Sequence, residues 1–211
     1  MIYNTLAQIS AFTILTLTSH LGYSIAPDHM LASHEFSLEK RYYPVQKENI
    51  LLNLAYMDGK VSKKEDINWD EIQKPQTYAF MLNPGETFAF HDDVLPEYSD
   101  KVVKTTNAHF NYAEGFKSYG YLVGDGVCHL ASLIYLVALD AGLDAKAPTR
   151  HDFMSIPEID RQYGVSIFNN PNLPGANAKQ NLYITNNRDK TVEFKFDYNG
   201  DKLKISVVEI N

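Results

Sequence analysis

The most regular alternation of hydrophobic and polar residues lies at the C-terminal end of the chain, in TVEFKFDYNGDKLKISVVEI. Asn199-Gly200 is the pair of residues that a two-residue turn between antiparallel strands prefers. A turn at that pair places Phe196 opposite Leu203 and gathers the apolar side chains on one face. We therefore predict a β-hairpin whose buried face comprises Val192, Phe194, Phe196, Leu203, Ile205 and Val207.

A second alternating stretch, TYAFMLNPGETFAF, spans residues 77–90. Its Pro84-Gly85 pair suits the two central positions of a type II turn, because proline presets the first and glycine tolerates the second. This pattern predicts another β-hairpin. The segment NLYITNN, residues 181–187, is expected to be a strand beside the C-terminal hairpin.

One segment is apolar on almost every side, from Val127 to Ala141, and Gly142 follows it. An all-round apolar helix is typically buried, and glycine commonly ends helices. The fold class expected is α+β, with a mostly antiparallel sheet packed on a central buried helix that begins at the single cysteine, Cys128.

The charge and the cysteine content exclude two features, a nucleic-acid partner and an internal disulfide. The 211 residues carry a formal net charge of −7 without any dense Lys/Arg stretch, so we expect no nucleic-acid partner. One cysteine forms no internal disulfide.

Residues 1–26 contain no Asp, Glu, Lys or Arg and have an apolar centre and a small-residue end, as in a secretory signal peptide. This stretch is too short and too rich in hydroxyl groups for a stable transmembrane span. The alternative is an N-terminal helix packed on the domain. We expect a signal peptide at 1–26, one domain at 27–211, and export to the cell envelope or the medium.

Cys128 is the candidate nucleophile. A helix N-terminus stabilises a thiolate through its unpaired N–H groups and the positive end of the helix dipole. Asp125 is the expected N-cap, and the backbone around Gly126 and Val127 would hold an oxyanion. His129 is expected to line the same pocket.

His151 is the candidate base, because a helix, a reversal and a strand return the chain to the helix start. A third group would orient its imidazole. Asp152, next in sequence, would point away from a strand histidine, which leaves Asn170 or Asn181.

Two other interpretations compete with thiol catalysis. A lone cysteine beside an apolar helix is often an inert core residue. A metal site is the other, although no pair of residues has the spacing of a known zinc motif, so neither a metal nor a cofactor is expected. Its candidate ligands are Cys128, His129, His91, Asp92, Asp93 and His109.

In combination, PGETFAF, GDGVCHLASLIYLVALDAGL, RHDF and NLYITNN resemble the VanW family over residues 35–211. The resemblance implies an accessory protein of the bacterial cell envelope, associated with vancomycin resistance. Asp125 and His129 replace a family glycine and glutamine, YGVSIF replaces an aspartate-containing stretch, and Asn181 stands where aspartate is common. The matching residues are Pro84, Gly85, Glu86, Gly124, Gly126, Val127, Cys128 and His151.

Residues 128–153 are also similar, more loosely, to the cores of transglutaminase-like and papain-like thiol enzymes. The VanW resemblance supplies a cell-envelope context, and the hypothesis for the mechanism is a cysteine-dependent amidohydrolase or acyl transferase that acts on a cell-wall peptide or glycopeptide. Cys128, His151 and Asn181 would be its catalytic residues. The alternative is a non-enzymatic binding module that uses the aromatic loop at 98–121, including Phe110 and Tyr112.

Overall fold

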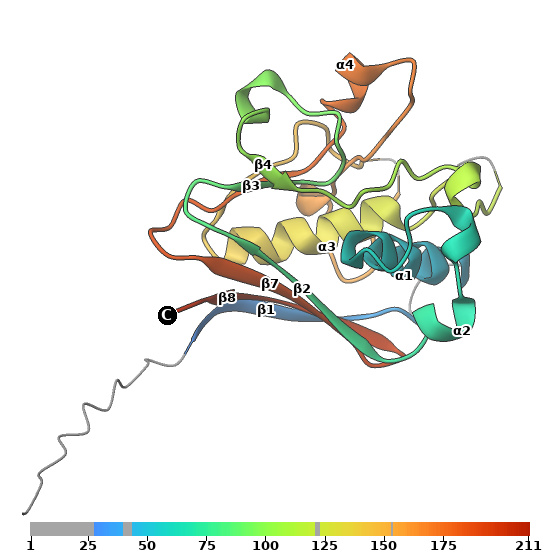
Figure 1. The fold of residues 1–211 in the computed structure, drawn as a ribbon, viewed down its shortest axis with the longest axis horizontal. Helices are drawn as coiled ribbons and strands as arrows, with labels where there is room; N and C mark the ends of the chain where they lie inside the picture. Colours follow the sequence, from blue (N-terminus) through green and yellow to red (C-terminus); the bar gives the residue numbers. More distant parts are fainter. Residues whose placement is uncertain (1–27, 40–43, 121–122, 153) are drawn as a thin grey trace, which may run out of the picture.

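The computed structural model describes residues 28–39, 44–120, 123–152 and 154–211. It contains helices and two four-stranded sheets, which confirms the α+β class (Figure 1). The predicted signal peptide lies outside the described residues. The first sheet has the order β1 (His29–Ser37), β8 (Lys202–Glu209), β7 (Val192–Tyr198) and β2 (Gln76–Leu82); the second has the order β4 (Val102–Lys104), β3 (Thr87–Ala89), β6 (Tyr183–Thr185) and β5 (Asp144–Lys146).

The C-terminal hairpin, β7 and β8, forms with the predicted buried face but with a different register. Phe196 pairs with Ile205, not with Leu203, so the pairing is shifted by two residues. The cause is the turn, in which the Asn199 side chain accepts hydrogen bonds from the backbone N–H groups of Asp201 and Lys202, at 3.2 and 2.9 Å. This makes the loop longer than two residues. An even shift keeps every side chain on its predicted face.

The predicted hairpin at residues 77–90 is wrong. The turn itself forms, with the Glu86 N–H donating to the Asn83 carbonyl at 3.0 Å. However, β2 pairs with β7 in the first sheet, whereas β3 pairs with β6 and β4 in the second. The turn thus carries the chain from one sheet to the other. For the same reason β6, from NLYITNN, is not a neighbour of the C-terminal hairpin.

Four α-helices are present among the described residues: α1 (Pro44–Asp58), α2 (Trp69–Ile72), α3 (Val127–Asp140) and α4 (Pro174–Asn177). Helix α3 lies beside α1 and between the two sheets, because it contacts β1 and β8 of the first sheet and β5 of the second (Figure 1). Short 3₁₀ helices occur at Lys64–Asp66, Pro96–Tyr98, Tyr112–Glu114 and Arg161–Tyr163.

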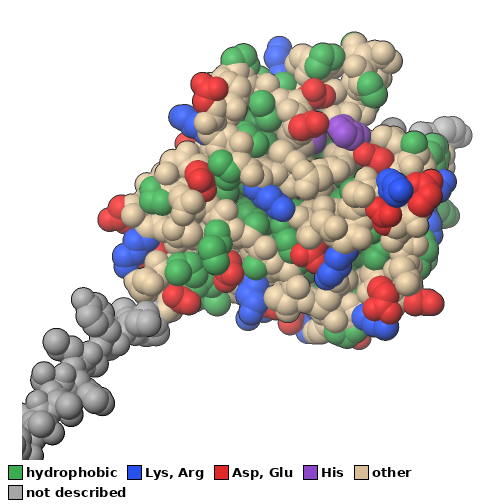
Figure 2. Space-filling view, in the orientation of Figure 1, with side chains coloured by type: hydrophobic (Ala, Val, Ile, Leu, Met, Phe, Trp, Pro, Cys, Tyr) green, Lys and Arg blue, Asp and Glu red, His purple; other side chains and the backbone are tan. Residues whose placement is uncertain are grey.

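Aromatic rings connect the two sheets in the core. The Phe80 ring of β2 stacks on Phe194 of β7 and on Phe88 of β3, each with centroids 5.0 Å apart. All three side chains are buried. On the face in Figure 2, acidic and basic side chains are interspersed and form no patch of a single sign.

Candidate functional site

Cys128 and His151 line the same pocket, a cavity of about 460 Å³. Its walls come from the start of α3, the loop before the Tyr112–Glu114 helix, and the segment after the Arg161–Tyr163 helix. The four expected pocket residues also line it, namely Asp125, Gly126, Val127 and His129. Residues 23 positions apart in sequence thus share one cavity, as the predicted return of the chain requires.

The start of α3 is built around Gly126. Its φ of 100° lies in the left-handed region, and a Cβ there would lie 2.5 Å from the Gln46 carbonyl oxygen of α1. Only glycine allows this approach of the two helices. Gly126 is the N-cap residue, so the prediction that Asp125 caps the helix is wrong. The Asp125 carboxylate instead accepts a hydrogen bond from the Tyr119 backbone N–H at 2.7 Å.

Some backbone N–H groups in the first turn of α3 already donate hydrogen bonds within the chain. The Val127 N–H donates to the Gly124 carbonyl at 2.9 Å, and the Leu130 N–H donates to the Gly126 carbonyl at 3.0 Å. Helix geometry supplies no intrahelical acceptor for the N–H of Cys128, the second residue of α3. Of the Val127 and Cys128 amides, the Cys128 N–H is therefore the one for which the helix start provides no backbone acceptor.

The Cys128 sulfur faces the backbone of Ile167. The Ile167 N–H donates to Sγ at 3.4 Å, and the thiol donates to the Ile167 carbonyl at 3.6 Å. Cys128 is half-buried, and desolvation of its sulfur raises the thiol pKa to about 11. Desolvation thus acts against the thiolate that the helix N-terminus was expected to stabilise, and the raised pKa disfavours a thiolate in the resting site.

His151 is buried, and burial lowers the pKa of its imidazole. Nδ1 lies 3.2 Å from the Met154 carbonyl oxygen. Because a carbonyl only accepts hydrogen bonds, Nδ1 carries the proton and Nε2 carries the lone pair. Both the thiol of Cys128 and the imidazole of His151 are therefore neutral at pH 7.

Residues 164–167 link the two candidate catalytic residues. The His151 N–H donates to the Gly164 carbonyl at 3.0 Å, and Ile167 contacts Cys128. Ser132, one helical turn after Cys128, fastens this segment to α3. Its hydroxyl donates to the Cys128 carbonyl at 2.7 Å and accepts from the Val165 N–H at 2.8 Å.

Sequence reasoning missed Ser132 and the Met154 carbonyl. The only available signal for Ser132 was a hydroxyl group four residues after Cys128 in an otherwise apolar run. The Met154 carbonyl is a backbone group, so no residue type marks it.

Asn181, the expected orienting residue, contacts a different histidine. Its carboxamide nitrogen donates to the backbone carbonyls of His91 and Asp93, both at 3.0 Å, and its oxygen accepts from the His91 N–H at 3.2 Å. Asn181 therefore holds the loop after β3. The group that faces His151 Nδ1 is the Met154 carbonyl, whereas Asn181 was expected to orient this ring.

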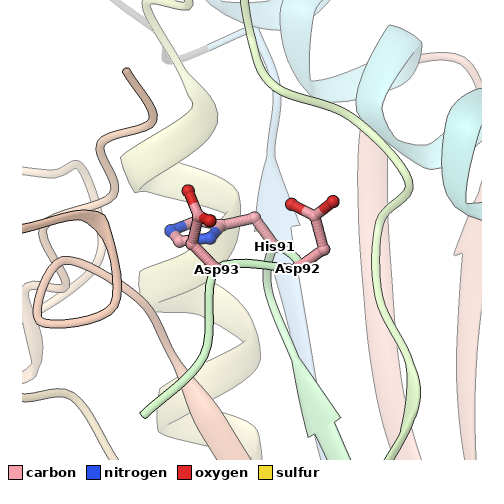
Figure 3. Close-up of side chains that lie close together, drawn as sticks. All are labelled: His91, Asp92 and Asp93. Atoms are coloured by element: carbon pink, nitrogen blue, oxygen red, sulfur yellow. The ribbon is translucent and has the colours of Figure 1, made fainter. Parts of the chain in front are cut away.

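The loop after β3 carries His91, Asp92 and Asp93, which lie close together (Figure 3). His91 is fully buried, and desolvation lowers its pKa. The Asp92 carboxylate lies 3.3 Å from His109 Nε2. This loop is thus an ordered part of the structure next to the pocket.

The fold and the pocket together define the class of this protein: an α+β protein with a cysteine and a histidine in one cavity. A family model described as VanW like protein matches residues 72–208, and the chain belongs to this family. Membership associates the chain with accessory proteins of the cell envelope. Neither the curated proteins nor the solved structures gave a match, so the similarity to transglutaminase-like and papain-like enzymes stays a prediction.

Across residues 28–39, 44–120, 123–152 and 154–211, no helix combines the length and apolar character needed to cross a bilayer.

Proposed function

We propose that this VanW-like protein is exported and cleaves or transfers an amide or peptide bond of cell-wall material, with Cys128 as nucleophile and His151 as base. The observation that supports it is the shared pocket, in which a neutral thiol and a neutral imidazole occur together. A neutral imidazole is the form that accepts a proton. The cavity is also within the size range of pockets that bind small molecules or short peptide segments.

The proposed reaction begins when substrate enters the pocket. His151 Nε2 takes the thiol proton as Sγ attacks the carbonyl carbon, and the oxyanion that forms accepts a hydrogen bond from the Cys128 N–H. The carbon–nitrogen bond then breaks, and the imidazolium returns its proton to the leaving amine. Water or a second amine resolves the thioester, which gives an amidohydrolase or an acyl transferase.

The orientation of His151 depends on the backbone in this proposal. The Met154 carbonyl holds the proton on Nδ1, so that Nε2 keeps the lone pair for the thiol. Ser132 acts as a positioning residue, because it fixes the start of α3 against the segment that contacts both Cys128 and His151.

The test is incubation of the purified protein with soluble peptidoglycan fragments, followed by mass spectrometry of the fragments and of the protein. We expect new amide-bond products and a transient acyl mass on Cys128. Cys128→Ala and His151→Ala should each remove the products, whereas exposed Ser99→Ala should not. Full activity in either site variant would overturn the mechanism.

A binding module without chemistry is the second candidate, and the raised thiol pKa favours it. Tyr112 is 58% exposed and available for recognition, whereas Phe110 is buried in the pocket wall. In this case Cys128→Ser would bind cell-wall fragments like the wild type, and Tyr112→Ala would bind them more weakly. Isothermal titration with the same fragments separates the two candidates.

Export is the remaining part of the proposal, supported by the uncharged, apolar residues 1–26. Mass spectrometry of the protein from the extracytoplasmic fraction should show loss of this segment. Retention of the intact N-terminus in the cytoplasm would contradict export.

A further inference from the structure

A buried histidine and two carboxylates meet in the loop that follows β3. One ligand atom from each of His91, Asp92 and Asp93 lies within 4.8 Å of the other two. In Figure 3 the His91 ring lies beside the Asp93 carboxylate, and the Asp92 carboxylate extends from the same side of the loop next to them. We propose that these three residues bind a divalent transition-metal ion such as Zn²⁺.

His91 is arranged as a metal ligand because its two ring nitrogens have different roles. Nε2 lies 3.1 Å from the Gln180 carbonyl oxygen, so Nε2 carries the proton and Nδ1 carries the lone pair. A metal-bound histidine usually donates its other N–H to such a carbonyl, which fixes the ring.

The lone pair on His91 Nδ1 has only a weak competing partner. Asn181 Nδ2 lies 3.3 Å away, but its two protons already face two backbone carbonyls at 3.0 Å, those of His91 and Asp93. An amide nitrogen has only two protons to donate. The Asn181 side chain therefore holds the loop in shape and leaves Nδ1 able to bind a metal ion.

The two carboxylates use their Oδ2 atoms for hydrogen bonds. Asp93 Oδ2 accepts from Asn177 at 2.6 Å and from Asn169 at 3.3 Å, and Asp92 Oδ2 faces His109 Nε2 at 3.3 Å. Among the residues that the structure describes, no hydrogen bond involves either Oδ1 atom, so these two oxygens would bind the ion. Two negative charges balance a divalent cation, and these partners fix the carboxylates as outer ligands do in metal sites.

Donor type and spacing suit zinc. Imidazole nitrogen and carboxylate oxygen bind Zn²⁺ at about 2.0–2.2 Å, so small side-chain rotations close the three atoms around one ion. Three residues that contact this loop, His109, Asn169 and Gln180, also line the pocket of Cys128. A bound ion would therefore stiffen one wall of that pocket.

Titration of ZnCl₂ into the untagged, chelator-treated full chain tests the site by calorimetry, and Co²⁺ absorption reports the ligands. We expect one saturable site and a rise in the thermal unfolding midpoint. Asp92→Asn removes an exposed ligand with little risk to folding, and should weaken zinc binding at least about tenfold. Asp100→Asn, an exposed carboxylate outside the cluster, is the matched control.

A second variant separates this site from the cysteine pocket. Cys128→Ser should keep wild-type zinc affinity and the Co²⁺ spectrum, because sulfur is not among the proposed ligands. Absence of saturable binding, or equal affinity in Asp92→Asn and Asp100→Asn, would overturn the proposal. A loss of binding in Cys128→Ser would place the ion at the cysteine instead and would equally overturn it.

Discussion

The two sheets of this molecule differ in how they are built. The strands of the first sheet are seven to nine residues long and wholly antiparallel, with alternating burial such as that of β7. The strands of the second sheet have three residues each. Long segments join the strands of the second sheet, and these segments carry His151, the His91 loop and Gln180. The first sheet is a platform, and the candidate site lies around the second, as is common for loops on a rigid scaffold.

Removal of a core ring from the first sheet should have the largest effect on stability. Phe194→Ala removes a fully buried ring that stacks on Phe80, and should lower the free energy of unfolding by about 3–5 kcal/mol. Urea denaturation measures the loss. Lys195→Ala, on the opposite face of β7, should change it by less than about 0.5 kcal/mol. Equal effects would contradict the platform role.

The helix start beside the pocket should be the next most sensitive position. Gly126→Ala combines a left-handed φ with a clash against Gln46, and should cost about 3 kcal/mol in unfolding free energy. Gly59→Ala has a similar φ of 77° but open space around it, so about 1 kcal/mol is expected. If both variants lose the same stability in urea, the close approach of α1 and α3 is not the reason for glycine.

Ser132 tests the link between α3 and residues 164–167. Ser132→Ala leaves the buried Val165 N–H without its acceptor, and should cost about 2 kcal/mol. It should also slow the proposed reaction, because Cys128 and His151 lose their common support. Ser99→Ala, which removes an exposed hydroxyl, is the control for both measurements. Wild-type stability and rate in Ser132→Ala would show that the link is dispensable.

The pH dependence of stability should show the smallest effect. Burial lowers the pKa of His151 in the folded protein. Above the unfolded-state pKa of about 6.5 the imidazole is neutral in both states, so burial of its neutral form carries no penalty for protonation. As the pH falls below that value, the unfolded chain binds a proton that the folded chain resists, and stability is lost. His151→Gln should flatten this decline below about pH 6.5 in urea titrations. An unchanged slope would contradict a buried neutral imidazole.

The same contrast explains what could be predicted from the sequence. In β7 and β8, local alternation decides which face is buried, so the face was predicted correctly. A shift of two residues leaves the alternation unchanged, so the register could not be predicted from the alternation. At residues 83–86 the turn was predicted correctly, but the strand partners were not, because β7 and β6 lie about one hundred residues away.

The pocket was only partly predictable for related reasons. The spacing of Cys128 and Gly142 indicates a helix and a return of the chain, which led to His151. The partners of these residues are backbone groups of Met154 and Ile167, and no side-chain pattern marks them. Asn181 had a suitable type and position, but its partner is decided by the pairing of β3 with β6, which the sequence did not reveal.

The most direct test of the neutral Cys128–His151 pair is the rate of thiol alkylation as a function of pH. Cys128 is the only cysteine in the chain, so iodoacetamide labelling reports this sulfur alone. We expect slow labelling at pH 7 and a rate that rises toward a midpoint of about 11. A rate that reaches its plateau below pH 8.5 would reveal a resting thiolate and contradict the neutral thiol and imidazole.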